Sequence, residues 1–342
     1  MPHIIANQID KLCNVEFHPG SGHCRGYGDA LYAAAREAQG NEPLTYLAAK
    51  CLMETVKKGD TVFVITGTGI DQWVPEGESD GPIGCAALAR ALVRAFDAKV
   101  VASCEEEMAK AMRATLMAAG EFVYQDALFD TLKEKACIVK PFPLGEEAGR
   151  QAAKTLVEKY HPTAMIFVER LGPNEAGIYH FVSGTVSSPE QMSYGHFLVE
   201  EAKKHGILTI GIGDGGNEIG FGKIVEQVRE ITEFGKKCKC PCGKGVATVC
   251  ETDVLISASI SNWGAYGITA MLAYLMKDPS ILHDSETEYR MVEACAMNGC
   301  IDGMYMKPYL SVDGVSVKSG QAVVTLMAEV VKNGLMHYER AF

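Results

Sequence analysis

Residues 207–222 read Ile207-Leu208-Thr209-Ile210-Gly211-Ile212-Gly213-Asp214-Gly215-Gly216-Asn217-Glu218-Ile219-Gly220-Phe221-Gly222. The stretch begins with an apolar run that predicts a buried strand, and six of its last twelve residues are glycines. Glycine permits turns that other residues avoid and lets a ligand approach the backbone. The loop also carries two carboxylates, Asp214 and Glu218, so a phosphate group is a poor fit. The stretch therefore indicates a strand that ends at a site for a metal ion, an ammonium group or proton transfer.

Similar apolar runs alternate with helical patterns along the chain. Strands are predicted at 61–66, 99–102, 136–139, 164–168, 207–212 and 253–258, and helices at 41–58, 82–96, 105–119, 145–160, 190–205, 265–275, 285–298 and 319–333. Apolar strands separated by helices are typical of a parallel sheet covered on both faces. We predict a doubly wound α/β fold with a mostly parallel sheet. Because no linker or repeat interrupts the pattern, we expect an N-terminal arm at 1–40 and a single catalytic domain at 41–342.

Composition limits the kind of partner. The net charge of −11 argues against nucleic acid and against an anionic membrane surface, and it is compatible with a cationic or zwitterionic small-molecule substrate. No apolar run is long enough to span a bilayer, and the first residues lack the pattern of a secretory signal. Twelve cysteines without such a signal fit free thiols in a reducing compartment, so we expect a cytoplasmic protein. The sequence does not decide the oligomeric state, and a homo-oligomer stays open.

Polar loops follow four of the predicted strands, after residues 66, 168, 212 and 258. Ligands of a doubly wound sheet bind where the carboxyl ends of the strands share one edge, so we expect these loops to converge. Their acidic residues are Glu76, Glu78, Asp80, Glu169, Asp214 and Glu218. Crowded carboxylates cannot all stay ionised without a counter-charge, which Mg²⁺, Mn²⁺, Ca²⁺, a substrate ammonium or the nearby Arg170 could supply. Asp80 also precedes a helix that begins with proline, which is a favourable position for a cap.

Neither of two nucleotide motifs is favoured. Gly211, Gly213 and Gly216 satisfy the spacing G-x-G-x-x-G, but Asp214 lies inside the motif and the motif occurs late in the chain. A Walker loop before Lys223 would need glycine where Asn217 stands. We therefore expect no nucleotide cofactor.

A cysteine cluster occurs at Cys238-Lys239-Cys240-Pro241-Cys242, with Cys250 beyond it. Zinc sites usually separate paired ligands by two to four residues, and the gaps here are one residue each. That spacing is poor for one tetrahedral ion, so a surface hairpin with free thiols is the favoured interpretation.

Several of these loops together resemble a known family. The strings that carry the resemblance are Thr66-Gly67-Thr68-Gly69, Glu78-Ser79-Asp80-Gly81-Pro82, Glu169-Arg170-x-Gly172 to Gly177-x-Tyr179, Ile212 to Gly220, Ser261-Asn262-Trp263-Gly264-x-Tyr266, Ile301-Asp302-Gly303 and Val312-Asp313-Gly314. Over roughly residues 45–335 the chain is similar to the D-glutamate cyclase family, in its catalytic C-terminal form. The resemblance implies an α/β fold and a lyase that dehydrates D-glutamate to 5-oxo-D-proline and water. It also implies a metal site of acidic residues in some members. The Cys238–Cys242 insertion and the segment before residue 40 depart from the family pattern.

On this basis we expect a lyase that cyclises D-glutamate or a related small amino acid. The expected catalytic residues are Glu169, Asp214, Asn217 and Glu218; the expected metal ligands are Glu78, Asp80, Asp214, Glu218 and Asp302; and the expected substrate-binding residues are Gly67, Thr68, Gly69, Arg170, Gly213, Gly215, Gly216, Ser261 and Asn262. A metal-free version would use two carboxyls of different pKa as acid and base. The alternatives are a metal-dependent hydrolase (a phosphatase or a small lactam or lactone hydrolase) on the same site and a binding protein without chemistry.

Overall fold

The computed structural model describes residues 1–17, 25–70 and 73–336. Within these residues the main sheet has six strands in the order β3-β2-β1-β4-β5-β6, and every neighbouring pair is parallel. A two-stranded antiparallel hairpin, β7-β8, lies outside this sheet. The expected doubly wound α/β fold is confirmed.

The elements follow the predicted alternation closely. The strands are β1 Thr61–Gly67, β2 Lys99–Ser103, β3 Ala136–Val139, β4 Ala164–Arg170, β5 Leu208–Gly213, β6 Val254–Ser257, β7 Ser311–Val312 and β8 Val315–Ser316. The α-helices are α1 Pro2–Cys13, α2 Tyr27–Ala38, α3 Leu44–Thr55, α4 Pro82–Phe96, α5 Ala109–Ala118, α6 Asp126–Phe129, α7 Glu146–Tyr160, α8 His196–His205, α9 Val225–Ile231, α10 Ser261–Leu275, α11 Ser285–Met297 and α12 Val317–Leu335, and two short 3₁₀ turns are η1 Gly222–Ile224 and η2 Pro279–Ile281.

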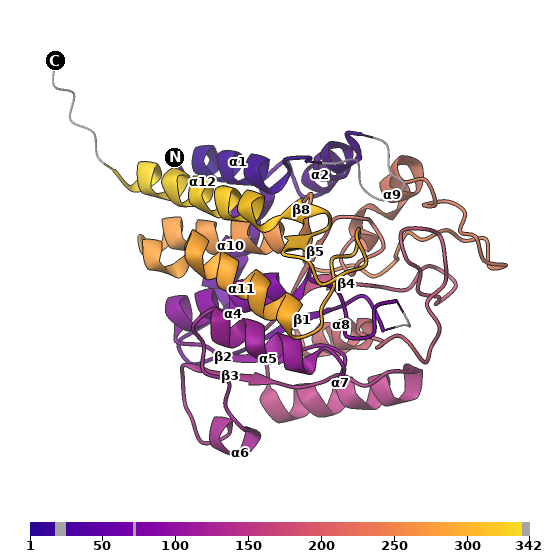
Figure 1. Ribbon diagram of the computed structural model, residues 1–342, viewed down its shortest axis with the longest axis horizontal. Coiled ribbons are helices and arrows are strands. Elements are labelled where there is room, and N and C mark those ends of the chain that lie inside the picture. The colour runs from indigo at the N-terminus through magenta and orange to yellow at the C-terminus, as the bar shows by residue number, and fades with distance from the viewer. Residues whose placement is uncertain (18–24, 71–72, 337–342) are drawn as a thin grey trace.

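The two faces of the sheet bury separate apolar clusters because successive strand residues point to opposite sides. In β1, Val62 and Val64 belong to the larger cluster, whereas Phe63 and Ile65 belong to the smaller one. Helices α1, α4, α10, α11 and α12 lie on the side of the larger cluster, and α7 covers the other side (Figure 1).

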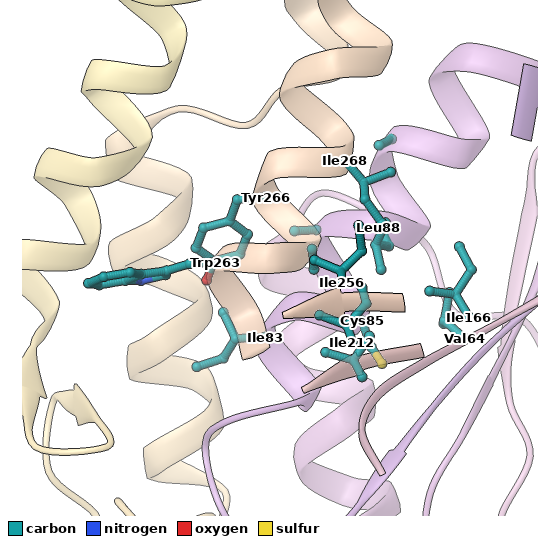
Figure 2. Packing of buried hydrophobic residues seen from close by; sticks show 14 of the residues in the cluster. Val64, Ile83, Cys85, Leu88, Ile166, Ile212, Ile256, Trp263, Tyr266 and Ile268 are labelled. Carbon is teal, nitrogen blue, oxygen red and sulfur yellow. The ribbon is translucent and has the colours of Figure 1, made fainter. Parts of the chain in front are cut away.

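Helices α4 and α10 form the layer that contacts the sheet most closely on the side of the larger cluster. Figure 2 shows Cys85 and Leu88 of α4 and Ile268 of α10 near the strand residues Val64, Ile166, Ile212 and Ile256, whereas Ile83 of α4 and Trp263 and Tyr266 of α10 lie farther from the strands. Fully burying an aliphatic side chain of this size contributes about 1.5–3 kcal/mol. This packing fixes the positions of both helix N-termini relative to the carboxyl edge of the sheet.

Helices α1 and α2 of the N-terminal segment pack against the rest of the described chain. Helices α1 and α2 place Ile5, Ile9, Cys13, Leu31 and Ala35 in the larger apolar cluster, where all five are buried. The boundary that we expected at residue 40 therefore does not coincide with a change in packing.

The strand order reverses between the neighbouring strands β1 and β4. From β1 the chain winds outward through β2 and β3, and from β4 it winds the other way through β5 and β6. Ligands of such sheets bind at this switch point, beyond the carboxyl ends of the strands. In the described part of the chain, no helix is both long enough and apolar enough to cross a membrane.

Candidate active site

A cavity of about 350 Å³ lies at the switch point. Its described lining residues are Tyr27, Thr68, Trp73, Val74, Glu78, Glu169, Leu171, Phe181, Val182, Ser183, Thr185, Asp214, Gly215, Asn217, Ser259, Gly303, Met304, Met306 and Asp313. They come from the segments after β1, β4, β5 and β6, as the sequence predicted, and also from α2 and the region after residue 300. Four of them are acidic and, among those described, none is lysine, arginine or histidine.

Glu169 enters this cavity through an irregularity in β4. The pairing of β4 with β1 shifts register between Ile65 and Gly67, and Glu169 has a left-handed backbone with φ 46°. Non-glycine residues seldom adopt this conformation, and such strain concentrates at functional sites. The Ser261 hydroxyl donates a hydrogen bond of 2.5 Å to Glu169 Oε2. Burial, followed by the nearby Asp214 and Glu218, raises the pKa of Glu169 well above its ordinary value.

Glu218 lies behind the glycine loop and holds it together. Its Oε1 accepts from the main-chain N–H of Asp214 at 2.8 Å and of Gly215 at 2.7 Å, and its Oε2 accepts from that of Gly216 at 2.7 Å. The residue is fully buried and does not line the cavity. Glu218 was expected to be a metal ligand and a catalytic residue, but its oxygens support the loop, and the N–H groups of Asp214, Gly215 and Gly216 are bonded to it.

Asp214 points the other way, into the cavity. Loss of water around it, and then the charges of Glu218, Asp313 and Asp80, raise its pKa well above the ordinary value. A carboxyl of this kind can act as a general acid near neutral pH because it keeps its proton.

Asn217 presents one half of its amide to the cavity. Its Nδ2 donates to the His180 main-chain oxygen at 2.8 Å, which fixes the orientation of the amide. Its Oδ1 is buried and has no hydrogen-bond partner within the described residues. A buried acceptor without a partner is costly, so this oxygen is suited to a ligand that brings an N–H group.

Asp80 and Asn262 cap each other's helices. Asp80 accepts from the N–H groups of Ser261 and Asn262, each at 2.8 Å, at the start of α10. Asn262 Oδ1 accepts from Gly81 N at 2.9 Å and Gly84 N at 2.6 Å at the start of α4, and its Nδ2 donates to Ser79 O at 3.1 Å. Asp80 therefore caps a helix, but that helix is α10 and not the proline-started α4 that it precedes in the sequence. Asn262 is a structural residue, not the substrate contact that we expected, and Ser261 contacts Glu169 instead of lining the cavity.

Glu78 and Asp313 complete the acidic rim. Burial raises the pKa of Glu78 to about 8, with Asp313 as the next cause. Burial also raises the pKa of Asp80 to about 7, although its two main-chain hydrogen bonds act in the opposite direction. Asp313 has a strongly raised pKa from burial and then from Asp80. The sequence analysis assigned Asp313 no role, and only the family string Val312-Asp313-Gly314 marked it.

Asp302 was expected to bind a metal, but its oxygens are occupied. Oδ1 accepts from the main chain at Met304 and Tyr305, and Oδ2 accepts from the Ser311 hydroxyl at 2.5 Å; both oxygens contact Gly314 N. It is fully buried outside the cavity lining. Asp302 therefore shapes the β7-β8 hairpin that carries Asp313.

Arg170 does not reach the cavity either. Its guanidinium forms an ion pair of 2.6 Å with Glu105 and donates to Thr66 O at 2.9 Å and to Ser193 O. The two charged side chains are 1% and 0% exposed. The expected hydrogen bonds from Arg170 to a substrate carboxylate are incompatible with this burial.

The expected substrate-binding residues of the glycine-rich loops divide into two groups. Thr68 and Gly215 line the cavity. The remaining glycines serve packing: a Cβ at Gly67 would meet Glu105 and Arg170, one at Gly69 would meet Gln191 and Met192, one at Gly213 would meet Glu218 and Phe221, and one at Gly216 would meet Val228. Gly216 also has φ 94°, a conformation that favours glycine.

Tyr27, at the start of α2, is a cavity residue that sequence reasoning missed. Burial, followed by Asp214 and Glu218, raises its pKa. Its position in the presumed N-terminal arm concealed it, and no local motif marked it.

The acidic side chains can be tested as a metal site by their donor atoms. One carboxylate oxygen from each of Asp80, Glu169 and Asp214 lies within 4.8 Å of the other two. Oxygen ligands of this kind suit Mg²⁺, Mn²⁺ or Ca²⁺, and a cation would relieve the crowding that raises these pKa values. The three residues therefore fit a divalent cation by donor type and spacing, although the Asp80 oxygens also accept from main-chain N–H groups at the start of α10.

Comparison with known proteins agrees with this geometry. The family described as "D-glutamate cyclase-like, C-terminal" matches residues 29–328. The human protein "D-glutamate cyclase, mitochondrial" is 28% identical over 229 residues, which cover 63% of this chain and 33% of the human protein. The chain thus aligns with about a third of that relative's length. Because the family match spans most of the sequence, the chain belongs to the D-glutamate cyclase-like family in its C-terminal form.

Proposed function

We propose that the protein is a lyase that cyclises D-glutamate, or a closely related small amino acid, to 5-oxo-D-proline and water. Family membership and the acidic cavity at the switch point support this proposal. The observation that carries it is the group of carboxyls with raised pKa, Glu169, Asp214, Glu78 and Asp313, around a space of amino-acid size.

The reaction needs two protons to move. The substrate nitrogen attacks the side-chain carboxyl carbon, a C–N bond forms, and one C–O bond breaks as water leaves. The ammonium nitrogen loses two protons and the departing oxygen gains two, so the sum is balanced without any oxidant or reductant. A carboxylate is a poor electrophile, so its charge must be neutralised and the tetrahedral oxyanion stabilised.

The cavity residues can divide these tasks. Asn217 Oδ1 accepts from the substrate ammonium and orients the nitrogen. Of Glu169 and Asp214, the carboxyl that is ionised takes a proton from that nitrogen and the protonated one gives a proton to the leaving oxygen, and two such transfers complete the departing water. Neutral carboxyls such as Glu78 donate hydrogen bonds to the oxyanion, in place of the loop N–H groups that Glu218 occupies.

A divalent cation is part of this proposal as an assisting group. Asp80, Glu169 and Asp214 would hold it, and it would supply Lewis-acid stabilisation of the substrate carboxyl. The cytoplasm is the location we propose, which the free thiols of the described cysteines support.

A substrate panel tests the proposal. The protein is incubated with D-glutamate, 5-oxoproline and a general phosphate ester, each with and without chelator, and products are separated by chiral chromatography. Formation of 5-oxo-D-proline from D-glutamate is the expected result. Release of phosphate, or ring opening without ring closure, would assign the site to the hydrolase alternative, and binding without turnover would make the protein a binding protein.

A further inference from the structure

Four thiol and imidazole groups converge outside the acidic cavity. Cys238, Cys240 and Cys242 lie in the loop after α9, and His180 comes from the loop after β4, 60 residues before Cys240. The Sγ atoms are 3.4 Å apart for Cys238 and Cys240, 3.4 Å for Cys238 and Cys242, and 3.2 Å for Cys240 and Cys242. His180 Nε2 is 3.3 Å from Cys240 Sγ and 3.9 Å from Cys242 Sγ. The three cysteines are free of disulfides, as expected, but their Sγ atoms lie close together instead of apart along a hairpin, and a histidine distant in the sequence lies beside them.

These distances approach the edges of a tetrahedron around one ion, with the sulfur–sulfur distances of 3.2–3.4 Å somewhat shorter than the ideal edge. Zinc binds cysteine sulfur at about 2.3 Å and histidine nitrogen at about 2.0–2.1 Å, so ligand atoms are separated by about 3.5–3.8 Å. The four ligand atoms all lie within 4.8 Å of one another. A disulfide would join only two of the three sulfurs and leave the third in close contact with both.

The surroundings orient these groups as ligands. His180 Nδ1 is 3.2 Å from Ile178 O, which fixes the proton on Nδ1 and leaves the Nε2 lone pair toward the sulfurs. Asn174 Nδ2 donates to Gly245 O at 2.8 Å and approaches Cys242 Sγ at 3.6 Å. Lysines at 236, 237, 239 and 244 lie beside the cluster in the sequence, and two of them, Lys236 and Lys244, form ion pairs with Glu230 and Glu175.

The donor set also restricts the metal. Thiolate and imidazole ligands in a tetrahedral arrangement select zinc over the hard cations that suit the acidic cavity. In an iron–sulfur cluster the protein ligands are shared between different iron atoms, whereas here every ligand atom is near every other one. Four protein ligands leave no open position, which is typical of a structural and not a catalytic zinc.

We propose that His180, Cys238, Cys240 and Cys242 bind one structural zinc ion that fixes a wall of the acidic cavity. Two contacts connect the site to that wall. The main-chain oxygen of His180 accepts from the Asn217 amide at 2.8 Å, and Lys239 N donates to Gly184 O at 2.8 Å. Between these anchor points the chain supplies Phe181, Val182 and Ser183 to the cavity lining. Figure 1 shows both loops at the end of the molecule where α9 lies.

Metal analysis of the purified protein tests the site directly. The protein is prepared under reducing conditions and without a histidine tag, and zinc and iron are measured by mass spectrometry. We expect one zinc per chain in the wild type and in Cys250→Ser, which removes the next cysteine along the sequence. We expect Cys240→Ser and His180→Ala to lose zinc; the second keeps the main-chain oxygen that Asn217 contacts.

Two further readouts do not depend on enzyme activity. Replacement of zinc by Co²⁺ should give the visible absorption of tetrahedral cobalt with a thiolate charge-transfer band, and Cys240→Ser should weaken both. A strong chelator should lower the thermal unfolding temperature of the wild type but not that of a folded, zinc-free Cys240→Ser. A metal-free wild type, unchanged zinc in Cys240→Ser, or iron with inorganic sulfide in place of zinc would each overturn the proposal. These outcomes are independent of whether D-glutamate is the substrate.

Discussion

Asp214 and Glu218 are four residues apart in one glycine loop, yet they belong to two different regions. Asp214 belongs to the cavity rim, together with Glu78, Glu169 and Asp313, where carboxyls crowd around a space and have raised pKa values. Glu218 belongs to the support behind the rim, where main-chain N–H groups or a guanidinium occupy the carboxylate oxygens. Acidic residues in the sequence therefore indicate the region of the site. The hydrogen-bond and ion-pair partners of each carboxylate oxygen decide whether that residue is available to a ligand.

The largest expected effect on stability comes from breaking the buried ion pair between Arg170 and Glu105. Arg170→Met should lower the free energy of unfolding by about 3–5 kcal/mol, because Glu105 is left buried and unpaired. Urea denaturation measures the change. The control is Lys204→Met, which removes an ion pair of 2.7 Å at the surface and should cost about 1 kcal/mol or less. A stable Arg170→Met protein with only a raised KM would return Arg170 to the role of substrate anchor.

A substitution at the cavity rim should lower the reaction rate and leave the free energy of unfolding nearly unchanged. Asp214→Asn should lower kcat for 5-oxo-D-proline formation by about two to three orders of magnitude, as is typical for loss of a group that acts on the transition state. Its unfolding midpoint should stay close to that of the wild type, since the change removes an ionisable group from a crowded cluster of acids. Glu107→Gln, an exposed acid elsewhere, is the control. Full turnover by Asp214→Asn would contradict the assignment of the cavity as the active site.

Glu218→Gln should weaken the support by a smaller amount. A glutamine offers one acceptor oxygen where three N–H groups converge, and its own amide donors face them. Leaving buried donors without a partner costs about 1–3 kcal/mol. Chemical denaturation measures the total loss of unfolding free energy, and hydrogen exchange at the Gly215 and Gly216 amides should become faster. Exchange at wild-type rates would show that the loop does not depend on this carboxylate.

The free energy of unfolding should also depend on pH, and the raised pKa values of Glu78 and Asp80 set the direction of the change. Glu78 and Asp80 have folded pKa values of about 8 and about 7, above their ordinary values of 4.5 and 3.8. The folded state thus holds protons that the unfolded state has lost, so in chelator the free energy of unfolding should fall as pH rises from about 5 to about 8. The slope is at most about 1.4 kcal/mol per pH unit for each group, and Glu78→Gln should reduce it. Stability that rises over this interval would contradict the crowding of these acids.

Much of the fold was predictable because its signals are local. The apolar run at 136–139 and the helix at 82–96 were placed at their observed bounds, since a strand between breakers and a proline-started helix are set by neighbouring residues. The hairpin at residues 311–316 and the helix α1 were missed. The hairpin strands have two residues each, and α1 carries its apolar residues on a single face whose partner lies far away in the sequence.

The site was predictable as a region but not residue by residue. The loops after the strands converge because parallel strands end at one edge, and Glu169, Asp214, Asn217 and Thr68 do line the cavity. Arg170 and Asn262 were misplaced because their partners, Glu105 and the start of α4, are many residues away. No spacing rule indicates which of two nearby acids faces inward.

The amino-acid sequence by itself determined the alternation of strands and helices, the acidic character of one sheet edge and the membership of the family, because these follow from periodicity and from contiguous strings. Only the tertiary structure decided which carboxylates stay available at the cavity, and that His180 joins three cysteines at a common point. Both outcomes depend on hydrogen bonds and contacts between segments distant along the chain, and the backbone path that brings such segments together is a property of the whole fold.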